Sequence, residues 1–206
     1  MKLGINGFGR IGRLAFKAAR QNKFEVVGIN DITTPSTLAH LLKYDSIHGR
    51  FDGTISSDDK NIIVDGIKIP VSAELDPSKL AWGNLGAEIV LECTGKFNTG
   101  PDASKHLQAG AKKVLMSAPA KGHDGTFIPG INCNKYDKSK HHVISIGSCT
   151  TNCLAPLVKV LLDNFGIVQG YMTTIHSYTA DQKLLDAPHK DLRRARAAAL
   201  SMVPTS

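Results

Sequence analysis

Short apolar runs alternate with segments of helical periodicity along most of this chain. The segments 2–6 and 25–30 are mainly apolar, and between them apolar residues recur at helical spacing, at Leu14, Ala15, Ala18 and Ala19. Further apolar runs at 88–93, 114–116 and 142–146 predict buried strands. Because buried strands that alternate with helices are typical of parallel sheets, the pattern predicts an α/β protein with a doubly wound sheet.

Two further segments fit this pattern. Leu38–Leu42 has the spacing of a helix, and the apolar runs 61–64 and 67–71 flank Asp65-Gly66. An Asp-Gly pair between two apolar runs is typical of a two-residue β-hairpin turn. We therefore expect a hairpin in addition to the parallel strands.

The last quarter of the chain predicts one helix and one strand. The helix runs from about Thr150 to Phe165, where apolar residues recur at helical spacing, and the alternating segment Ile167–His176 predicts a long strand. With 206 residues, the chain has length left for part of a second domain. We place the boundary so that residues 1–148 form the first domain and residues 149–206 the start of the second.

The first predicted strand runs directly into a glycine-rich turn, Gly7-Phe8-Gly9-Arg10-Ile11-Gly12. Gly-x-Gly-x-x-Gly between a strand and a helix is typical of dinucleotide binding. Gly7 would allow the tight turn, Gly9 the close approach of a pyrophosphate, and Gly12 the packing of helix on strand. The helix N-terminus then faces the phosphates.

Asp31 supports the same interpretation. It follows the strand 25–30, about 20 residues after the glycines, where a carboxylate accepts hydrogen bonds from an adenosine ribose. Since that carboxylate would repel a 2′-phosphate, the predicted cofactor is NAD rather than NADP. The alternative is an ordinary turn with an aspartate that caps a helix.

Two further strands end in small or polar residues. Thr94 and Gly95 follow the run 88–93, and Ser117 follows 114–116. Because ligands of open α/β sheets bind at the carboxyl ends of the strands, these residues are candidates for the nicotinamide side of the site. Simple strand-ending turns explain the pattern equally well.

Cys149 lies at the start of the helix predicted to Phe165, after the turn Gly147-Ser148. The unpaired N–H groups and the positive end of the helix dipole stabilise a thiolate there, which is the nucleophilic form of cysteine. The sequence also allows Cys149 and Cys153 to be small buried hydrophobic residues, or half of a metal site.

His176 ends the strand predicted from Ile167. If the fold brings it beside Cys149, it holds the thiolate as an ion pair and acts as general base. A lone histidine at a strand end is, however, more often structural.

Among the basic residues that follow at 183–196, at least one guanidinium is placed to bind a phosphate, and the others fit a solvated surface or a subunit contact.

Composition disfavours several classes of protein. No apolar run approaches the roughly 18 residues of a membrane span, and four cysteines without a secretory signal indicate a reduced, cytoplasmic protein. The formal charge of +7 fits a small anionic ligand better than nucleic acid, because basic residues mostly alternate with acidic ones and lack interleaved aromatic residues.

Four segments carry a resemblance to a known family: Asn6–Arg13, Ser148–Pro156, Thr173–Tyr178 and Pro188–Arg196. They resemble the phosphorylating glyceraldehyde-3-phosphate dehydrogenases, especially the bacterial ones, and Ser-Cys-Thr-Thr-Asn-Cys is the most specific motif. The resemblance covers the whole chain. It implies an NAD-binding Rossmann domain followed by the first part of an α+β catalytic domain, and a homotetramer in the full-length form.

The resemblance also implies roles for individual residues. Cys149 is implied as the nucleophile and His176 as its base. The implied cofactor contacts are Arg10, Ile11, Asp31 and Ser117, and Pro188 together with Asp31 resembles the NAD-selective members. The implied phosphate sites are Thr179, Asp181 and Arg194 for the substrate and Ser148 and Thr150 for inorganic phosphate. No metal is implied.

The chain departs from the family at three places. Leu75 stands where many members carry an arginine near the adenine, so we expect one cofactor contact to be lost. Ile146-Gly147 replaces a more usual Asn-Ala pair, which should change local packing without removing a reacting group. Family members also continue past Ser206 with most of the catalytic domain.

The resemblance implies a glycolytic oxidoreductase that converts D-glyceraldehyde 3-phosphate, with NAD and inorganic phosphate, to 1,3-bisphosphoglycerate through a cysteine thioester. Two alternatives stay open. One is oxidation of erythrose 4-phosphate, since members of that branch share most of these motifs. The other is a truncated, non-catalytic NAD-binding module. Without the rest of the catalytic domain that family members have, the apolar faces of segments 150–165 and 167–176 would be exposed.

Overall fold

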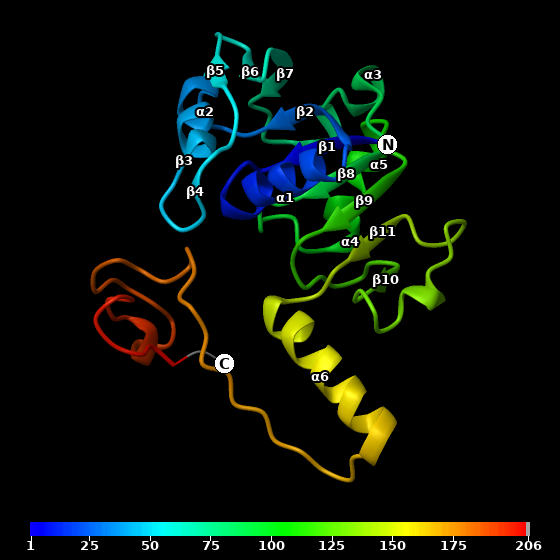
Figure 1. The fold of residues 1–206 in the computed structure, drawn as a ribbon, viewed down its shortest axis with the longest axis vertical. Coiled ribbons are helices and arrows are strands. Elements are labelled where there is room, and N and C mark those ends of the chain that lie inside the picture. Colours follow the sequence, from blue (N-terminus) through cyan, green and yellow to red (C-terminus); the bar gives the residue numbers. More distant parts are fainter. Residues whose placement is uncertain (205–206) are drawn as a thin grey trace. The chain divides into compact units, whose positions relative to one another are not determined.

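Parallel strands form the centre of the protein, whose structure is a computed structural model that describes residues 1–204. The main strands are β1 (Lys2–Asn6), β2 (Glu25–Asn30), β5 (Ile55–Ser57), β6 (Asn61–Val64), β7 (Ile67–Ser72), β8 (Ile89–Glu92), β9 (Lys113–Met116), β10 (Gly125–Thr126) and β11 (Val143–Ser145). Across the sheet they follow the order β10-β11-β9-β8-β1-β2-β7-β6-β5 (Figure 1). Neighbours from β10 to β7 are parallel, and β7, β6 and β5 are antiparallel.

The α-helices lie between these strands, except for α6, which follows the last strand. They are α1 (Arg10–Gln21), α2 (Pro35–Lys43), α3 (Trp82–Leu85), α4 (Gly100–Ala103), α5 (Lys105–Gln108) and α6 (Cys149–Phe165). The short strands β3 (Tyr44–Asp45) and β4 (Gly49–Arg50) form a separate antiparallel pair after α2. The predicted strands 2–6 and 25–30 are confirmed, and the predicted helix from about Thr150 begins at Cys149.

The chain reverses its direction across the sheet at β1. From β1 it proceeds through α1 to β2 and then to β7 on one side, whereas β8, β9 and β11 follow one another on the other side. The predicted doubly wound α/β sheet is therefore confirmed. In such a sheet, the carboxyl ends of the strands beside the reversal form a crevice that binds ligands. Here those ends are at Asn6, Asn30 and Glu92.

The predicted hairpin forms between β6 and β7. Asp65 has φ of 49° and Gly66 has φ of 81°, so both turn residues are left-handed, as a two-residue hairpin turn requires. The pairs Val64–Ile67 and Ile62–Ile69 then continue the antiparallel ladder. This hairpin extends the sheet beyond its parallel part without a crossover helix.

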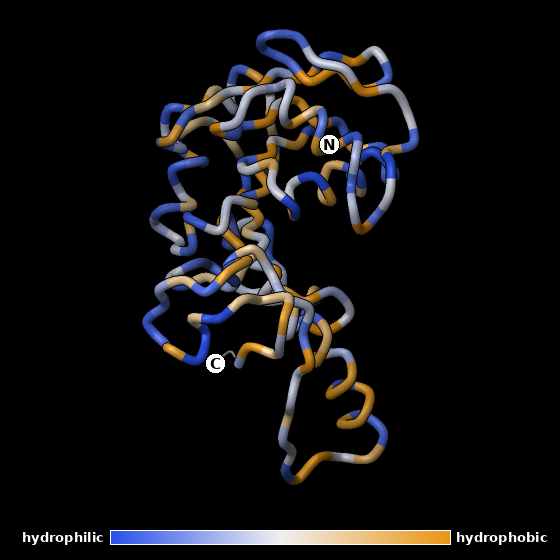
Figure 2. Tube along the Cα trace, turned by 90° about the vertical axis from the view of Figure 1, so that its left-hand side faces the viewer, coloured by the Kyte–Doolittle hydropathy of each residue, from blue (hydrophilic) through white to orange (hydrophobic). Residues whose placement is uncertain are grey.

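The core lies on both faces of the central strands, where the apolar runs gather (Figure 2). Ile5, Ile62 and Val90 are completely buried, and Trp82 of α3 is 1% exposed. Trp82 packs where β1 has a glycine, because a Cβ on Gly4 would lie 2.8 Å from its ring. A larger residue at Gly4 would therefore displace α3 from the sheet.

Two compact units divide the chain, Met1–Gly166 and the residues from Ile167 onward. Regular secondary structure in the described part of the second unit is limited to one 3₁₀ turn, Leu192–Arg194. The strand predicted at Ile167–His176 is therefore wrong. A strand needs a neighbour for its N–H and C=O groups, and residues 167–204 contain no second strand to pair with this segment.

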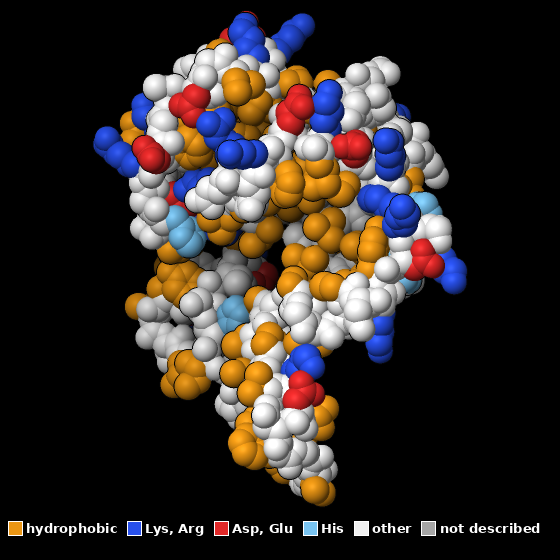
Figure 3. Space-filling model, turned by 45° about the vertical axis from the view of Figure 1, so that its right-hand side comes forward, with side chains coloured by type: hydrophobic (Ala, Val, Ile, Leu, Met, Phe, Trp, Pro, Cys, Tyr) orange, Lys and Arg blue, Asp and Glu red, His pale blue; other side chains and the backbone are white. Residues whose placement is uncertain are grey.

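α6 belongs to the first unit but has no buried residue. Four of its apolar side chains, Leu157, Val160, Leu162 and Phe165, are more than half exposed. Figure 3 shows exposed hydrophobic side chains on the lower end of the molecule in this view. The domain boundary predicted before Cys149 stays a prediction. Among the described residues, no helix is both long enough and apolar enough to cross a membrane.

Candidate active site

The turn between β1 and α1 is shaped by its three glycines. Gly7 has φ of +87°, which residues with a Cβ rarely adopt. A Cβ on Gly12 would lie 2.0 Å from the backbone oxygen of Gly7, so only glycine allows the helix to pack this closely. A Cβ on Gly9 would meet nothing within 4 Å. The turn is thus closed at Gly12 and open at Gly9, as the approach of a pyrophosphate requires.

The N-terminus of α1 follows this turn. Gly9 is the capping residue, and no side chain of the described residues caps the first N–H groups. The first turn of α1 also has no acidic residue. These N–H groups and the positive end of the dipole therefore suit an anion. Of the predicted contacts here, Ile11 is exposed, and the Arg10 guanidinium donates to Asp45 Oδ2 at 2.5 Å.

Asp31 is tied to the same turn. Its Oδ2 accepts from the backbone N–H of Phe8 at 2.7 Å, and its Oδ1 accepts from that of Thr33 at 3.0 Å. These bonds hold the carboxylate just past the end of β2, beside the glycine-rich turn. A carboxylate in this place suits the ribose hydroxyls of a dinucleotide whose pyrophosphate lies at the turn.

The loops after β8 and β9 end at the same edge of the sheet. Thr94 lies against the glycine-rich turn, since a Cβ on Gly7 would be 2.7 Å from the Thr94 N atom. Gly95 has φ of +68°. Ser117 hydrogen-bonds the thiol of Cys93, whose pKa is raised to about 12 chiefly by burial. Cys93 is therefore a protonated thiol at neutral pH and no nucleophile.

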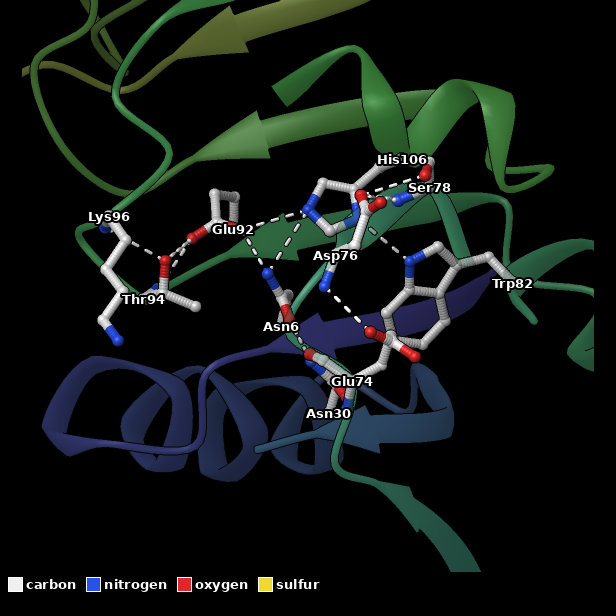
Figure 4. A network of polar contacts seen from close by, with 10 residues as sticks. All are labelled: Asn6, Asn30, Glu74, Asp76, Ser78, Trp82, Glu92, Thr94, Lys96 and His106. Carbon is white, nitrogen blue, oxygen red and sulfur yellow. Dashed lines mark hydrogen bonds and ion pairs between the residues drawn. The ribbon is translucent and has the colours of Figure 1, made fainter. Parts of the chain in front are cut away.

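A buried polar network, which the sequence analysis missed, joins these strand ends (Figure 4). Its central members are Asn6, Asn30, Trp82, Glu92 and His106, each 5% exposed or less. Asn6, Asn30 and Glu92 are the last residues of β1, β2 and β8. A polar residue at the end of three apolar strands is the signal from which the network could have been found.

Cys149 is the first residue of α6, directly after the sheet strand β11 and its turn. Gly147 makes that turn with φ of +73°, and a Cβ on it would lie 2.9 Å from Ile128 Cδ1. The Ser148 hydroxyl caps the helix by accepting from the Thr151 N–H at 2.9 Å. The first turn of α6 has no acidic residue, so no negative side chain there offsets the positive end of the helix dipole beside Cys149. Thr150 is half-buried beside it.

The exposure of the two cysteines in α6 corrects one alternative. Both Cys149 and Cys153 are exposed, so neither is a small buried hydrophobic residue. The other alternative is half of a metal site. The described residues contain no group of three or more side chains that could hold a metal ion together, so nothing in them supports this alternative. An exposed thiol at a helix N-terminus is accessible to a substrate, and it is more nucleophilic than a thiol buried among apolar residues.

In the second unit, the three predicted groups for the substrate's phosphate come together. Arg194 Nη2 donates to Asp181 Oδ2 at 2.8 Å, and the Thr179 hydroxyl donates to Asp181 Oδ1. The Thr179 hydrogen bond, with that of Arg194, lowers the pKa of Asp181. Arg194 Nε is buried and has no hydrogen-bond partner among the described residues. Asp181 thus positions Arg194, which retains donor capacity for an anion.

His176 is also in the second unit. Its Nδ1 lies 2.6 Å from the carbonyl oxygen of Ser177. Because a carbonyl only accepts, Nδ1 carries a proton, and in the neutral ring Nε2 is then the basic nitrogen. Cys149 lies in the first unit, so the pairing of the two residues stays a prediction.

Comparison with known proteins places these features in a family. Residues 1–100 match the family model described as glyceraldehyde 3-phosphate dehydrogenase, NAD binding domain, and residues 148–206 match that of its C-terminal domain. Among curated proteins, the chain is 61% identical to glyceraldehyde-3-phosphate dehydrogenase of Geobacillus stearothermophilus and 60% identical to glyceraldehyde-3-phosphate dehydrogenase 1 of Bacillus subtilis (strain 168). It is 55% identical to the enzyme of Thermotoga maritima.

Each of these comparisons covers 100% of this chain and 62% of the relative, so the chain spans about three fifths of the relatives' length. The first family model contains the glycine-rich turn and Asp31, and the second begins at the Ser148 cap beside Cys149. With both domains of one family matched in order, the chain belongs to the glyceraldehyde 3-phosphate dehydrogenase family.

Proposed function

We propose that the native protein is an NAD-dependent dehydrogenase that oxidises glyceraldehyde 3-phosphate and adds inorganic phosphate, giving 1,3-bisphosphoglycerate. The observation that carries the proposal is Cys149, an exposed thiol on the first residue of α6 at the carboxyl edge of a sheet with a dinucleotide-type turn. The names of the relatives favour glyceraldehyde 3-phosphate over erythrose 4-phosphate.

The residues that fit NAD are those of the glycine-rich turn and the strand ends. Gly9 and the N-terminus of α1 would hold the pyrophosphate, and Asp31 the adenosine ribose. Thr94, Gly95 and Ser117 line the strand ends on the other side of β1, where the nicotinamide would lie. Bound NAD supplies the hydride acceptor for the oxidation.

Cys149 performs the covalent chemistry. Its thiolate attacks the aldehyde carbon and forms a hemithioacetal, and the N–H groups of the first turn of α6 stabilise the developing oxyanion. His176 accepts the hydroxyl proton at Nε2 as the hemithioacetal becomes a thioester. Inorganic phosphate, held by the hydroxyls of Ser148 and Thr150, then attacks the thioester and releases Cys149.

The substrate's own phosphate binds the group formed by Thr179, Asp181 and Arg194. The guanidinium supplies charge and a planar pair of donors, which suits phosphate oxygens. The Asp181 carboxylate, being negative, contributes by fixing Arg194 rather than by contacting the phosphate. We further propose, from the family, a cytoplasmic homotetramer for the native protein.

The proposal is tested by replacing the nucleophile. Cys149→Ala in the native protein should lower phosphate-dependent NADH production from glyceraldehyde 3-phosphate by roughly 1,000-fold or more, since no other group forms the thioester. The affinity for NAD, measured by calorimetry, should stay within about twofold. Cys153→Ala is the matched control on the same helix and should keep normal turnover.

Retained turnover in Cys149→Ala would overturn the assignment of the nucleophile.

Values of kcat/KM for glyceraldehyde 3-phosphate and erythrose 4-phosphate, measured side by side, separate the two aldehydes. Assayed alone, the 206-residue chain should bind NAD with little turnover if the remaining length found in the relatives is needed for catalysis.

A further inference from the structure

Glu92 lies at the centre of the buried network in Figure 4. It is the last residue of β8 and is 3% exposed. Oε1 accepts from both the backbone N–H and the hydroxyl of Thr94, and Oε2 accepts from Asn6 Nδ2 at 2.5 Å and from His106 Nε2 at 3.0 Å. Because a buried carboxylate is unfavourable without partners, four donors on one side chain indicate that the site is built for an ionised Glu92.

The contacts of His106 fix its protonation state. Trp82 Nε1 is a donor only, and it lies 3.0 Å from His106 Nδ1, so Nδ1 must accept. The proton of the neutral ring is then on Nε2, which donates it to Glu92. His106 is completely buried. It therefore serves as an oriented neutral donor, and the charge of Glu92 is balanced by hydrogen bonds rather than by a cation.

The network reaches all three loops that form the cofactor crevice. Thr94, held by Glu92, lies against Gly7, where the N atom of Thr94 is 2.7 Å from the position of a Gly7 Cβ. Asn6, the residue before Gly7, accepts at Oδ1 from Asn30 Nδ2 at 2.7 Å, and Asn30 directly precedes Asp31. Glu92 is thus linked to the turn after β1, the end of β2 and the loop after β8.

We propose that Glu92, supported by His106, is a positioning residue that sets the affinity for NAD by holding these three loops in register. This inference rests on the proposed function, because it assumes that the crevice binds NAD. Glu92 does not contact α6 or its thiol in any hydrogen bond described for it. Its effect should therefore fall on cofactor affinity and leave the chemical step largely unchanged.

The decisive variant is Glu92→Gln in the native protein. An amide offers one acceptor oxygen where the carboxylate has two, so at least one buried donor loses its partner and an NH₂ group faces other donors. The Kd for NAD, measured by calorimetry, should rise about 10- to 100-fold, and the KM for NAD should rise in parallel. We expect kcat at saturating NAD to change less than about threefold.

Glu88→Gln is the matched control, since it makes the same chemical change just before the other end of β8. Glu88 is on the surface, where it accepts from the Lys2 backbone N–H and lies 3.6 Å from Lys112 Nζ. The affinity of this variant for NAD should equal that of the wild type. A general loss of stability would lower the active fraction in either variant without changing the Kd of the folded molecules.

A second pair of variants decides the question if Glu92→Gln does not fold. Thr94→Val removes the hydroxyl that donates to Glu92 but keeps the backbone N–H, and it should weaken NAD binding by roughly 5- to 10-fold. Thr94→Ser keeps the hydroxyl and should recover most of that loss. Folding is checked by circular dichroism for every variant.

The outcomes separate this inference from the proposed function. If the wild type does not bind NAD, the proposed function is overturned, and this inference with it. If the wild type binds NAD but Glu92→Gln and Thr94→Val bind it equally well, the inference alone is overturned. A fall in kcat with an unchanged Kd for NAD in Glu92→Gln would also overturn it, since the residue would then act on the chemistry.

Discussion

Apolar residues form a buried core within residues 1–166, whereas most of them are exposed in residues 167–204. Leu3, Ile5 and Val90 are 4% exposed or less, while Val168 and Ile175 are 93% exposed or more. Each apolar side chain left in water forgoes roughly 1.5–3 kcal/mol of burial free energy. The first region gains this energy because each of its strands has neighbours, and the second has no strand in its described part.

The two regions also hold their functional groups differently. The cofactor groups of the first region are fixed by contacts between residues far apart in sequence, such as Asn6 with Glu92. The residues proposed to bind the substrate's phosphate in the second region are held by local bonds, such as that of Arg194 with Asp181. Local polar contacts can therefore gather a few side chains without a sheet, but they bury little apolar surface.

Hydrogen exchange on the 206-residue chain gives the largest expected contrast between the regions. Amides of β1 and β8 should exchange roughly 1,000-fold or more slowly than unstructured amides, because they open only with the whole sheet. Amides of residues 167–176 should exchange at nearly the unstructured rate. Strong protection of residues 167–176 would show that the predicted strand does form in solution.

The second and third glycines of the turn, Gly9 and Gly12, test how tightly the first region is packed. Gly12→Ala places a methyl group 2.0 Å from a backbone oxygen and should lower the free energy of unfolding by about 1–3 kcal/mol, measured by denaturation followed with circular dichroism. Gly9→Ala is the control, since it meets nothing within 4 Å, and it should cost less than about 0.5 kcal/mol. Equal losses in both variants would contradict the described packing.

Arginine substitutions in the native protein test whether the second region binds the substrate's phosphate independently of NAD binding by the first region. Arg194→Lys loses the planar guanidinium that Asp181 positions, so the KM for glyceraldehyde 3-phosphate should rise about 10-fold while the Kd for NAD stays constant. Arg193→Lys is the matched control, because Arg193 pairs with Asp191 instead. An unchanged KM in Arg194→Lys would argue that positive charge alone, rather than the planar guanidinium that Asp181 positions, binds the phosphate.

The smallest expected difference between the two regions is in how acid changes their stability. The hydrogen bond from the Arg10 side chain, with those from backbone N–H groups, lowers the pKa of buried Asp45, and the Arg193 side chain lowers the pKa of Asp191 to about 2. A carboxyl whose pKa is lowered by folding stabilises the protein above its unfolded pKa of about 3.9, and this stabilisation is lost as the pH falls further.

Asp45→Asn should therefore reduce the loss of stability between about pH 4 and pH 2, because it removes a group that releases its proton more readily when folded. Asp191→Asn should change this acid sensitivity less, since Asp191 and Arg193 lie in one local, partly exposed turn. The measurement is the midpoint of denaturant unfolding at several pH values. A larger effect of Asp191 would show that residues 167–204 unfold cooperatively with the sheet.

Local patterns were sufficient to predict most of the sheet. Lys2–Asn6 and Glu25–Asn30 were predicted with their observed bounds, and the glycine-rich turn has the geometry expected from its spacing. These predictions succeed because period and turn chemistry are properties of adjacent residues. The strand at Ile167–His176 fails because its pattern carries no information about a partner.

The candidate site could be predicted only in part. Cys149 was found because a helix N-terminus can be located from the periodicity of the residues that follow. The contact of Asn6 with Glu92 joins residues 86 apart, and the contact of Trp82 with His106 joins residues 24 apart. Such contacts follow from the order of the strands, which a single sequence does not reveal.

Trp82 makes the opening of the sheet observable by fluorescence. It is the single tryptophan of the chain, it is 1% exposed, and its indole is bonded to His106. Its ultraviolet emission should therefore be that of a dry, rigid indole and should shift to the red when the sheet opens. The molecule thus contains its own optical probe of the NAD-binding sheet, placed in that unit alone.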